Sequence, residues 1–325
     1  MQLWMARLTN SLMSFRRATK RIASPPQTWT MTKNKLPFAN LRDVLDTTAT
    51  RLSTISDTPQ LDAEVLIAHV LEQPRTWLLA HDDSSFDPKA ASVLDSLIQR
   101  LEQGEPLPYV IGHWEFFGLD FNLTPDVLIP RPETELLIER AIPWLQSSGQ
   151  HCSIADIGTG CGCIAVSIAT HVPSANILAT DISSAALEVA RRNAYKHHVE
   201  NQIEFVECDI LPMPLSDESH FDLICANLPY IPTPKLHTLP IYGREPTLAL
   251  DGGNDGLDLF RRLLAIVPKR LAPGGRILLE IEATHGPAAL SLAYDAFEEA
   301  EIHLYQDLAQ QDRLLEIQLP LAEKI

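Results

Sequence analysis

The sequence has no apolar run near the ~18–20 residues that a helix needs to cross a bilayer, so we predict no membrane span. It also has no CxxC pair. No second Cys or His pair at ligand spacing accompanies Cys161 and Cys163, so no metal site is predicted. An odd number of thiols is typical of reduced cysteines in a cytosol-like compartment, and these are Cys152, Cys161, Cys163, Cys208 and Cys225.

The first 42 residues contain no Asp or Glu but eight Lys or Arg. An acid-free, Arg-bearing leader is typical of a mitochondrial transit peptide, which would place the protein in the mitochondrial matrix if residues 1–30 are one. The alternative is an upstream extension of the reading frame, with Met31 as the working start of a cytoplasmic protein. We favour this alternative because "SPPQTWTMTKNK" contains no strong helix. Residues 1–37 are interpreted as a basic leader, disordered or removed.

Positive charge is scarce in the rest of the chain. Eight of the 26 Lys and Arg lie in the leader and its first flanking residues, which leaves 18 against 42 Asp and Glu. This excess of negative charge repels phosphate backbones, so we expect no direct nucleic-acid binding. A protein or small-molecule partner fits better, and we expect a monomer.

With 325 residues, 45% of them apolar, the chain is long enough for two domains of the usual ~100–200 residues. Apolar residues recur at helical spacing between about 41 and 103, which predicts a small helical domain over 38–107. Alternation from Phe117 to Leu123 then predicts a β-hairpin, and residues 108–130 are interpreted as a linker. The second domain is predicted over 131–325.

Apolar strands alternate with amphipathic helices in this second domain, and two closing strands follow near its end. The pattern predicts an α/β fold with a doubly wound, mostly parallel seven-stranded sheet and an antiparallel hairpin at its edge. Ligands bind at the carboxyl ends of such strands. The first five strands are predicted at 153–158, 176–182, 203–209, 221–227 and 276–281.

Glycines follow the first predicted strand in "DIGTGCG", residues 156–162, directly before a helical run. Glycine lets the backbone approach a ligand, and a helix start offers unpaired N–H groups. A dinucleotide fingerprint would need its third glycine at position 163, which is Cys. The spacing, with Asp156 two residues before Gly158, therefore favours a ligand without a pyrophosphate.

Two further acids end the next two strands. Asp181 is placed to accept hydrogen bonds from both hydroxyls of a ribose, and Asp209 is placed to reach an adenine edge. Each acid alone would more often be a helix cap or a loop residue. In this order, and together with Asp156, they favour a pocket for an adenosyl cofactor.

The fourth strand ends in "CANLPY", residues 225–230. The Asn227 side-chain oxygen can accept one N–H of a planar amine or amide, and the Leu228 carbonyl can accept another. Pro229 fixes the turn, and Tyr230 offers a flat face. An amide nitrogen is a poor nucleophile because its lone pair is shared with the carbonyl. Two aligned acceptors would therefore lower the barrier to methyl transfer.

Five segments in order resemble one family: "LDAEVLIAHVL", "VLIPRPETE", "DIGTGCGCIA", "NLPYIP" and "REPTLALDGGNDGLDLF". From about Leu41 to the C-terminus the chain is similar to the HemK/PrmC protein-(glutamine-N5) methyltransferases, which act on class I peptide-chain release factors. The resemblance implies a class I methyltransferase-like, Rossmann-like fold and S-adenosylmethionine as methyl donor. It implies a role in translation termination, with the glutamine of the release factor's Gly-Gly-Gln loop as acceptor and the helical domain as the release-factor-binding part.

The same resemblance implies the site residues. Asn227 and Tyr230 would be catalytic, with Leu228 and Pro229 completing the substrate site. Pro132-Glu133 is interpreted either as a helix start or as a substrate contact. The donor would be held by Asp156, Gly158, Thr159, Gly160, Cys161, Gly162, Asp181, Asp209 and Ile210.

Three residues depart from the family pattern. Leu228 replaces the first proline of Asn-Pro-Pro-Tyr, which leaves the turn less rigid. Glu282 replaces the glycine of Glu-Ile-Gly, and Gln310 replaces the glycine of D-x-x-G-x-x-R. None of the three removes a group assigned to catalysis.

Three alternatives remain open at this point. Asn-Leu-Pro-Tyr also occurs in adenine-N6 methyltransferases of ribosomal RNA, where the same pocket would hold a flipped adenine; the acidic composition argues against this. A catalytically silent adaptor would have no use for an intact Asn227 and Tyr230. The glycine spacing argues against an NAD-dependent dehydrogenase.

Overall fold

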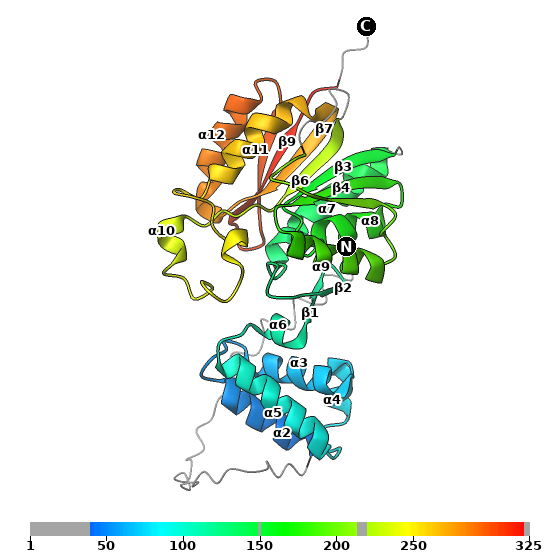
Figure 1. The fold of residues 1–325 in the computed structure, drawn as a ribbon, viewed down its shortest axis with the longest axis vertical. Coiled ribbons are helices and arrows are strands. Elements are labelled where there is room, and N and C mark those ends of the chain that lie inside the picture. The colour runs from blue at the N-terminus through cyan, green and yellow to red at the C-terminus, as the bar shows by residue number, and fades with distance from the viewer. Residues whose placement is uncertain (1–39, 149–150, 213–219, 322–325) are drawn as a thin grey trace. The chain divides into compact units, whose positions relative to one another are not determined.

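The structure is a computed structural model that describes residues 40–148, 151–212 and 220–321 (Figure 1). The predicted leader, residues 1–37, lies outside the described residues. Among the helices described, none combines the length and apolar character that a membrane crossing requires.

The described chain begins with helices whose apolar faces form a core of their own. Leu66 and Ile67 are fully buried there, and Ile98 is nearly so. The side chains of Asn40 and Asp87 cap two of the helices by accepting backbone N–H bonds, as short polar residues at helix starts do. The helices are α2 (Leu41–Leu52), α3 (Pro59–Leu71), α4 (Arg75–Ala80), α5 (Pro88–Glu102) and α6 (Leu107–Ile111).

An antiparallel hairpin follows, formed by β1 (His113–Phe116) and β2 (Leu119–Asn122). Its two-residue turn is Phe117-Gly118, with φ of 51° and 76°. Both residues are thus left-handed, as the favoured hairpin turns require. The prediction that Phe117 belongs to the strand is wrong, because this residue forms the turn and places its ring edge-on against His171.

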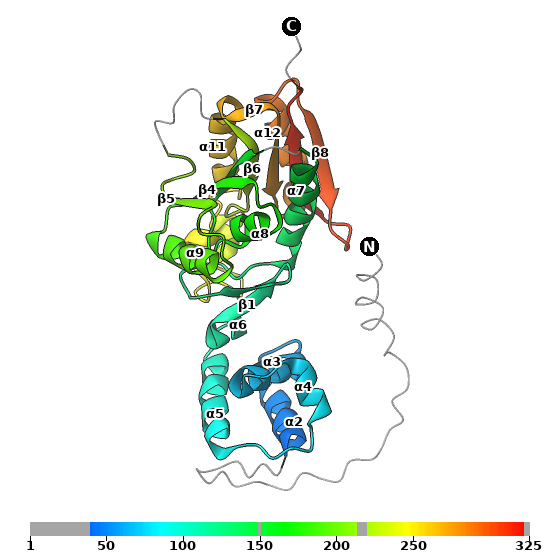
Figure 2. The same cartoon turned by 90° about the vertical axis from the view of Figure 1, so that its right-hand side faces the viewer.

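A seven-stranded sheet forms the second part of the chain, in the order β5-β4-β3-β6-β7-β9-β8. Figure 2 shows it running from β5 at one edge to β8 at the other. The first five strands are parallel, and the last two pair antiparallel. This confirms the predicted fold class. The strands are β3 (Cys152–Ile157), β4 (Ala175–Asp181), β5 (Ile203–Glu207), β6 (Phe221–Ala226), β7 (Leu271–Glu280), β8 (Glu301–Gln306) and β9 (Asp312–Gln318).

Helices cover both faces of this sheet, so the inner strands bury both sets of alternating side chains. The edge strands β5 and β8 leave part of theirs exposed. Ile154 packs into the core on one face, while its neighbour Ala155 packs into the core on the other. One face carries α7 (Glu135–Ser148), α8 (Cys163–His171) and α9 (Ser184–Lys196), and the other carries α11 (Asp258–Ile266) and α12 (Gly286–Ala296) (Figure 1).

A buried asparagine on α9 ties the hairpin to the glycine-rich loop. The Asn193 side chain accepts the Asn122 N–H at 2.8 Å and donates to the carbonyls of Asn122 and Cys161 at 3.0 and 2.8 Å. Buried amides need this full set of partners. The hairpin is therefore fixed to the glycine-rich loop, although the expected domain boundaries at 107 and 130 stay a prediction.

Two of the departures from the family pattern have a local explanation. Glu282 caps the 3-10 turn at Ala283–His285 by accepting the Thr284 N–H at 2.8 Å. Gln310 has a φ of 59°, in the left-handed region that favours glycine. Gln310 thus adopts, at a conformational cost, a backbone conformation that glycine adopts readily.

Candidate active site

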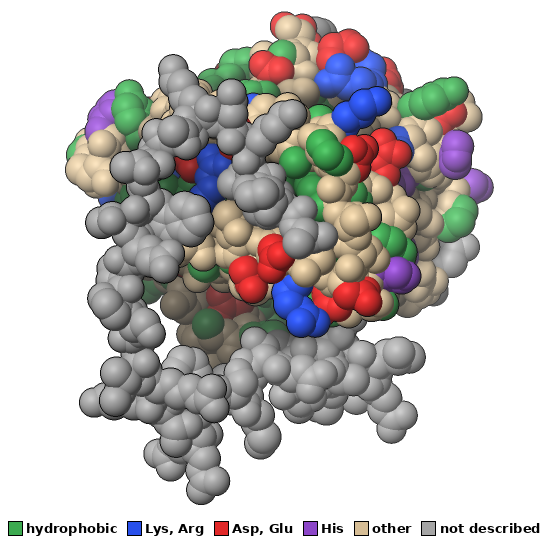
Figure 3. All heavy atoms as spheres, turned by 90° about the horizontal axis from the view of Figure 1, so that it is seen from below, with side chains coloured by type: hydrophobic (Ala, Val, Ile, Leu, Met, Phe, Trp, Pro, Cys, Tyr) green, Lys and Arg blue, Asp and Glu red, His purple; other side chains and the backbone are tan. Residues whose placement is uncertain are grey.

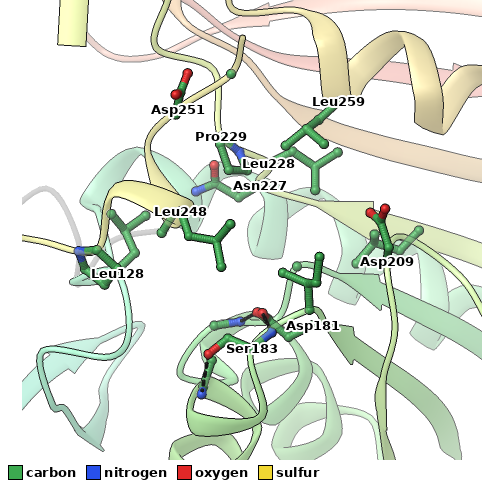
Figure 4. Close-up of a pocket in the computed structure, with 18 of the residues that line it drawn as sticks. Leu128, Asp181, Ser183, Asp209, Asn227, Leu228, Pro229, Leu248, Asp251 and Leu259 are labelled. Carbon is green, nitrogen blue, oxygen red and sulfur yellow. Dashed lines mark hydrogen bonds between the residues drawn. The ribbon is translucent and has the colours of Figure 1, made fainter. Parts of the chain in front are cut away.

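A cavity of about 790 Å³ opens at the carboxyl ends of the central strands, within the usual size of small-molecule sites (Figure 4). In the view of Figure 4, Asn227, Leu228 and Pro229 lie above Asp181 and Ser183, with Asp209 to one side. Eight predicted site residues line this cavity: Gly158, Gly160, Asp181, Asp209, Ile210, Asn227, Leu228 and Pro229.

The glycine-rich loop makes a close approach to the substrate motif. Gly158 and Gly160 have φ of 73° and 56°, and a Cβ on Gly158 would lie 3.1 Å from the Leu228 side chain. The Gly160 N–H donates to the Asp181 carboxylate at 2.9 Å. The loop and the end of β4 are therefore locked together on the cavity wall.

Asp156 supports this loop from behind. It is fully buried, and its Oδ2 accepts the Thr159 hydroxyl at 2.6 Å and the Ala165 N–H at 3.1 Å. Burial raises its pKa to about 7. The structure does not place Asp156 on the cavity wall, nor Thr159, Cys161 and Gly162. Their part in donor binding stays a prediction.

Two carboxylates lie where a ribose and a base could meet them. Asp181 accepts the N–H groups of Gly160 and Ser183 and keeps its carboxylate on the cavity, where burial raises its pKa. Asp209 is half exposed and paired with Arg262, which also lines the cavity. Carboxylates at adjacent strand ends are the acceptors that ribose hydroxyls and an amino group need. The residues present therefore fit an adenosyl donor.

The Asn227 amide is held by a buried hydroxyl. Its Nδ2 donates to Oγ1 of Thr134 at 3.0 Å, and Thr134 is 1% exposed. Among the hydrogen bonds of the described residues, none ends on Asn227 Oδ1. The amide thus presents an acceptor that is free for a ligand in the cavity that Asn227 lines.

Tyr230 is oriented differently from the rest of its motif. Its hydroxyl donates to Glu280 Oε1 at 3.3 Å, and burial together with the Glu280 charge raises its pKa. Tyr230 is not among the residues that line the cavity. The role of its ring as a face for the substrate stays a prediction.

Several residues on the cavity wall were not predicted. Leu128 comes from the expected linker, and the exposed Leu248 comes from the 3-10 turn Thr247–Ala249. Of residues 231–246, the Pro-rich segment that follows the substrate motif, Pro246 alone lines the cavity. The repeated glycines in "DGGNDG" could have indicated that this segment packs against the substrate motif. A Cβ on Gly252 would lie 2.7 Å from Tyr230 Cα, so only glycine fits there.

Comparison with known proteins gives the family. Residues 43–112 match the PrmC N-terminal domain, and residues 154–239 match a methyltransferase domain. The release factor glutamine methyltransferase of Moorella thermoacetica is 42% identical over 275 residues, which cover 84% of this chain and 96% of that protein. This chain belongs to the release factor glutamine methyltransferase family. The predicted resemblance is confirmed.

A second relative and two solved structures are also similar to this chain. The release factor glutamine methyltransferase of Bordetella pertussis is 41% identical, covering 79% of this chain and 93% of that protein. The structure of a release factor-specific protein-(glutamine-N5) methyltransferase from Alicyclobacillus acidocaldarius is 27% identical over 62% of this chain and 99% of that chain, with a TM-score of 0.38. The hMettl16 catalytic domain, solved with an RNA hairpin, is 14% identical over 74% of this chain and 84% of that chain, with a TM-score of 0.50, and supports the fold alone.

Proposed function

We propose that this chain transfers a methyl group from S-adenosylmethionine to the side-chain amide nitrogen, N5, of the glutamine in the Gly-Gly-Gln loop of a class I release factor. The observation that carries the proposal is the Asn227 amide, whose nitrogen is held by Thr134 and whose oxygen is left for a ligand. It lies in one cavity with the Asp181 and Asp209 carboxylates. The family to which the chain belongs supports the same reaction.

The donor site uses the carboxyl ends of β3, β4 and β5. S-adenosylmethionine supplies an electrophilic methyl group when it is bound. Asp181 accepts ribose hydroxyls, while Asp209 and Arg262 lie where the adenine edge is expected. Gly158 and Gly160 keep side chains out of the space between the donor and the substrate motif.

The acceptor site uses the turn after β6. Asn227 Oδ1 and the Leu228 carbonyl each accept one N–H of the glutamine amide, which aims the nitrogen lone pair at the methyl carbon. Alignment of this kind can contribute about 7–11 kcal/mol to lowering a barrier. The two acceptors also favour the positive charge that develops on nitrogen during attack. No base is needed before the attack: the nitrogen–methyl bond forms as the donor's sulfur–methyl bond breaks, the donor leaves as the neutral thioether, and the extra proton on nitrogen then passes to water.

The helical residues 38–107 bind the release factor body in this proposal, which agrees with their match to the PrmC N-terminal domain. The chain would then read the substrate at two places, one on the helices and one in the cavity. A Gly-Gly-Gln peptide alone should therefore be a far weaker substrate than the whole release factor.

The test is to incubate the protein with isotope-labelled S-adenosylmethionine, a class I release factor and ribosomal RNA in one reaction. We expect label on the release factor, in the peptide that contains the Gly-Gly-Gln glutamine. A release factor with that glutamine changed to asparagine is the matched control and should stay unlabelled. Label on adenine of RNA, with none on the release factor, would overturn the proposal in favour of the adenine-N6 alternative.

A further inference from the structure

A buried carboxylate joins two segments of the cavity wall, and the reaction above does not use it. It belongs to Glu245, whose side chain is 4% exposed. Its Oε2 accepts the Ile129 N–H at 3.0 Å, and its Oε1 pairs with the Arg131 guanidinium. Ile129 lies 116 residues earlier in the chain. The Glu245 carboxylate thus fixes two segments that meet only in the folded protein.

Both segments continue directly into the wall of the cavity. Residues 125–128 line it just before Ile129, and residues 246–249 line it just after Glu245. In the view of Figure 4, Leu128 and Leu248 lie on one side of the cavity, below Asn227, and Asp209 lies on the other. We call residues 125–128, 227–229 and 246–249 the acceptor half of the cavity.

A series of hydrogen bonds also connects Glu245 to Asn227. Arg131, the ion-pair partner, precedes the 3-10 turn Pro132–Thr134, and its carbonyl accepts the Thr134 N–H at 3.0 Å. Thr134 Oγ1 in turn accepts from the Asn227 amide at 3.0 Å. One ion pair, one turn and one side-chain hydrogen bond therefore separate the Glu245 carboxylate from the amide that is proposed to hold the substrate.

The backbone on both sides of the ion pair is stiff. Pro132 follows Arg131, and Pro246 follows Glu245. Proline fixes its own φ and restricts the residue before it to extended conformations. Arg131 has φ of −101° and ψ of 142°, which is such a conformation. A displacement of Arg131 would therefore move the turn and Thr134 with it, because local rotation cannot absorb the change.

The physical chemistry of the pair favours a role in positioning over a role in stability. A buried carboxylate loses its hydration and needs a charged partner and hydrogen bonds. Buried ion pairs add little net stability compared with apolar side chains of similar size. They do fix geometry, because a guanidinium and a carboxylate bond in defined directions.

We propose that Glu245 is a positioning residue that holds the acceptor half of the cavity in the geometry that methyl transfer requires. Its two oxygens set the spacing between the walls that carry Leu128 and Leu248, and they fix the turn that orients Asn227. The inference rests on the proposed function, because this geometry matters for turnover only if a substrate amide is aligned there. It adds that the acceptor half is built independently of the donor carboxylates.

The first experiment compares turnover with donor binding in Glu245→Gln. The glutamine oxygen can meet one of the two donors, Ile129 N–H or Arg131, and its NH₂ group then faces the other. We expect kcat/KM for a class I release factor to fall about 10–100-fold, as misplacement of reacting groups does. Affinity for S-adenosylmethionine by calorimetry should stay within about twofold, because Asp181 and Asp209 are untouched.

Glu135→Gln is the matched control. Glu135 also accepts a backbone N–H, from Phe117 at 2.9 Å, but it lies outside the cavity lining. This variant should keep the turnover of the wild type. Unchanged turnover in Glu245→Gln, or a loss of donor affinity as large as the loss of turnover, would overturn the inference.

The second experiment changes the partner of Glu245. Arg131→Lys keeps a positive donor for the carboxylate and should keep turnover within about fivefold of the wild type. Arg131→Met keeps a long side chain without the charge, and should lose about as much turnover as Glu245→Gln. Equal turnover in the lysine and methionine variants would contradict the role of the ion pair.

A double variant separates positioning from stability. Arg131→Met alone leaves the buried Glu245 carboxylate without its charged partner, so its thermal midpoint should fall. Arg131→Met combined with Glu245→Gln removes this lone charge and should regain part of the midpoint, while turnover stays as low as in Arg131→Met. If turnover recovers together with stability, the pair has only a structural role and the inference fails.

A measurement without substrate distinguishes this inference from the proposed function. The NMR signals of the Leu128 and Leu248 methyl groups, assigned by their loss in Leu128→Ile and Leu248→Ile, should both shift in Glu245→Gln. The signals of Leu66, in the core of the helices, are the reference and should stay in place. If wild-type protein methylates no release factor but both signals shift, the proposed function fails and the positioning by Glu245 stands. Leucine signals that do not shift contradict the inference, whatever the substrate.

Discussion

At the residue scale, the proposed reaction depends on a hydrogen-bond acceptor that is in place before the substrate arrives. Thr134 holds the Asn227 amide from behind at 3.0 Å, so the amide does not have to be ordered during the reaction. In the proposed acceptor site, Leu228 would contribute its backbone carbonyl rather than its side chain. The replacement of the family proline by leucine therefore leaves the acceptor group itself unchanged.

Asn227→Ala removes one of the two acceptors, and we expect kcat/KM to fall by about 10²–10³-fold. Affinity for S-adenosylmethionine should change by less than about twofold, because Asp181 and the glycine loop are untouched. Calorimetry and a methyl-transfer assay measure the two quantities. Asn201→Ala, at an exposed asparagine, is the control. Unchanged turnover in Asn227→Ala would refute the role of the amide.

Asp156 should make folding stability depend on pH. Burial raises its pKa from 3.8 to about 7, so the folded protein keeps a proton that the unfolded chain has lost. Its contribution to the free energy of unfolding therefore falls as pH rises from about 4 to about 7. In Asp156→Asn the amide oxygen can still accept from the Thr159 hydroxyl and the Ala165 N–H. The amide does not titrate, so this variant lacks the pH-dependent contribution.

Urea unfolding at pH 5 and pH 8 tests this expectation. The stability of Asp156→Asn relative to the wild type should increase between the two values, by more than about 1 kcal/mol. The comparison is between variants, so titrations common to both proteins cancel. A difference that is the same at both pH values would show that the carboxyl group ionises freely in the folded state.

At the element scale, the turn after β6 is held by the glycine-rich segment that follows it. The Ile231 N–H donates to the Leu250 carbonyl, and the Gly252 N–H donates to the Ile231 carbonyl, at 3.0 and 2.9 Å. A Cβ at Gly252 would meet Tyr230 Cα at 2.7 Å and the Pro229 oxygen at 2.8 Å. The two backbone segments approach so closely at Gly252 that a residue with a Cβ would not fit there.

Gly252→Ala should therefore displace the substrate motif. Because the clash is with backbone, we expect a loss of about 1–3 kcal/mol of unfolding free energy and at least about tenfold lower turnover. Urea unfolding and the methyl-transfer assay measure these. Gly118→Ala is the control for turnover alone. The hairpin turn lies outside the cavity lining, so activity should be kept, although alanine at a φ of 76° also costs stability. Normal turnover in Gly252→Ala would contradict the packing argument.

Gln310→Gly should stabilise the protein. The residue has a φ of 59°, where a side chain costs roughly 1–2 kcal/mol relative to glycine, and the added flexibility of glycine in the unfolded chain offsets part of the gain. We expect a net increase of about 0.5–1 kcal/mol in the free energy of unfolding by urea. Gln311→Gly, next to it, should instead destabilise, because Gln311 accepts a bond from Arg313. A less stable Gln310→Gly would be the contrary result.

The sequence predicted the elements better than the contacts between them. Strand ends such as Asp181 and Asn227 could be found because apolar runs stop there, and parallel strands bring their ends to one edge. The bond from Asn227 to Thr134 joins residues 93 apart and leaves no local pattern. Thr134 lies in "RPETE", which was interpreted as a helix start or a substrate contact; a 3-10 turn does begin at Pro132.

Asp156 shows a second limit of sequence reasoning. An acid before a glycine loop was interpreted as a ligand contact, and its position next to the loop was correct. Whether it faces the ligand or the interior depends on the alternation along β3, which a six-residue strand buried on both faces does not reveal. Asp156 faces the interior because its carboxylate accepts the Ala165 N–H near the start of α8.

At the scale of the whole molecule, the distribution of charge favours a protein substrate over a nucleic-acid substrate. On the face in Figure 3, the Lys and Arg side chains of the described residues are scattered among acidic and apolar ones and do not gather into one patch. The chain carries a formal net charge of −16. Such a surface disfavours the phosphate contacts that dominate nucleic-acid affinity, which agrees with a release factor as substrate.

The most direct test of the account is to map the methyl group after reaction of the wild-type protein and Asn227→Ala with a class I release factor. Peptide mass spectrometry should find one added methyl on N5 of the Gly-Gly-Gln glutamine with the wild type, and a loss of at least about 10²-fold in its rate of formation with the variant. A methyl group on another residue, or equal rates for the two proteins, would contradict the claim that Asn227 holds a glutamine amide for methyl transfer.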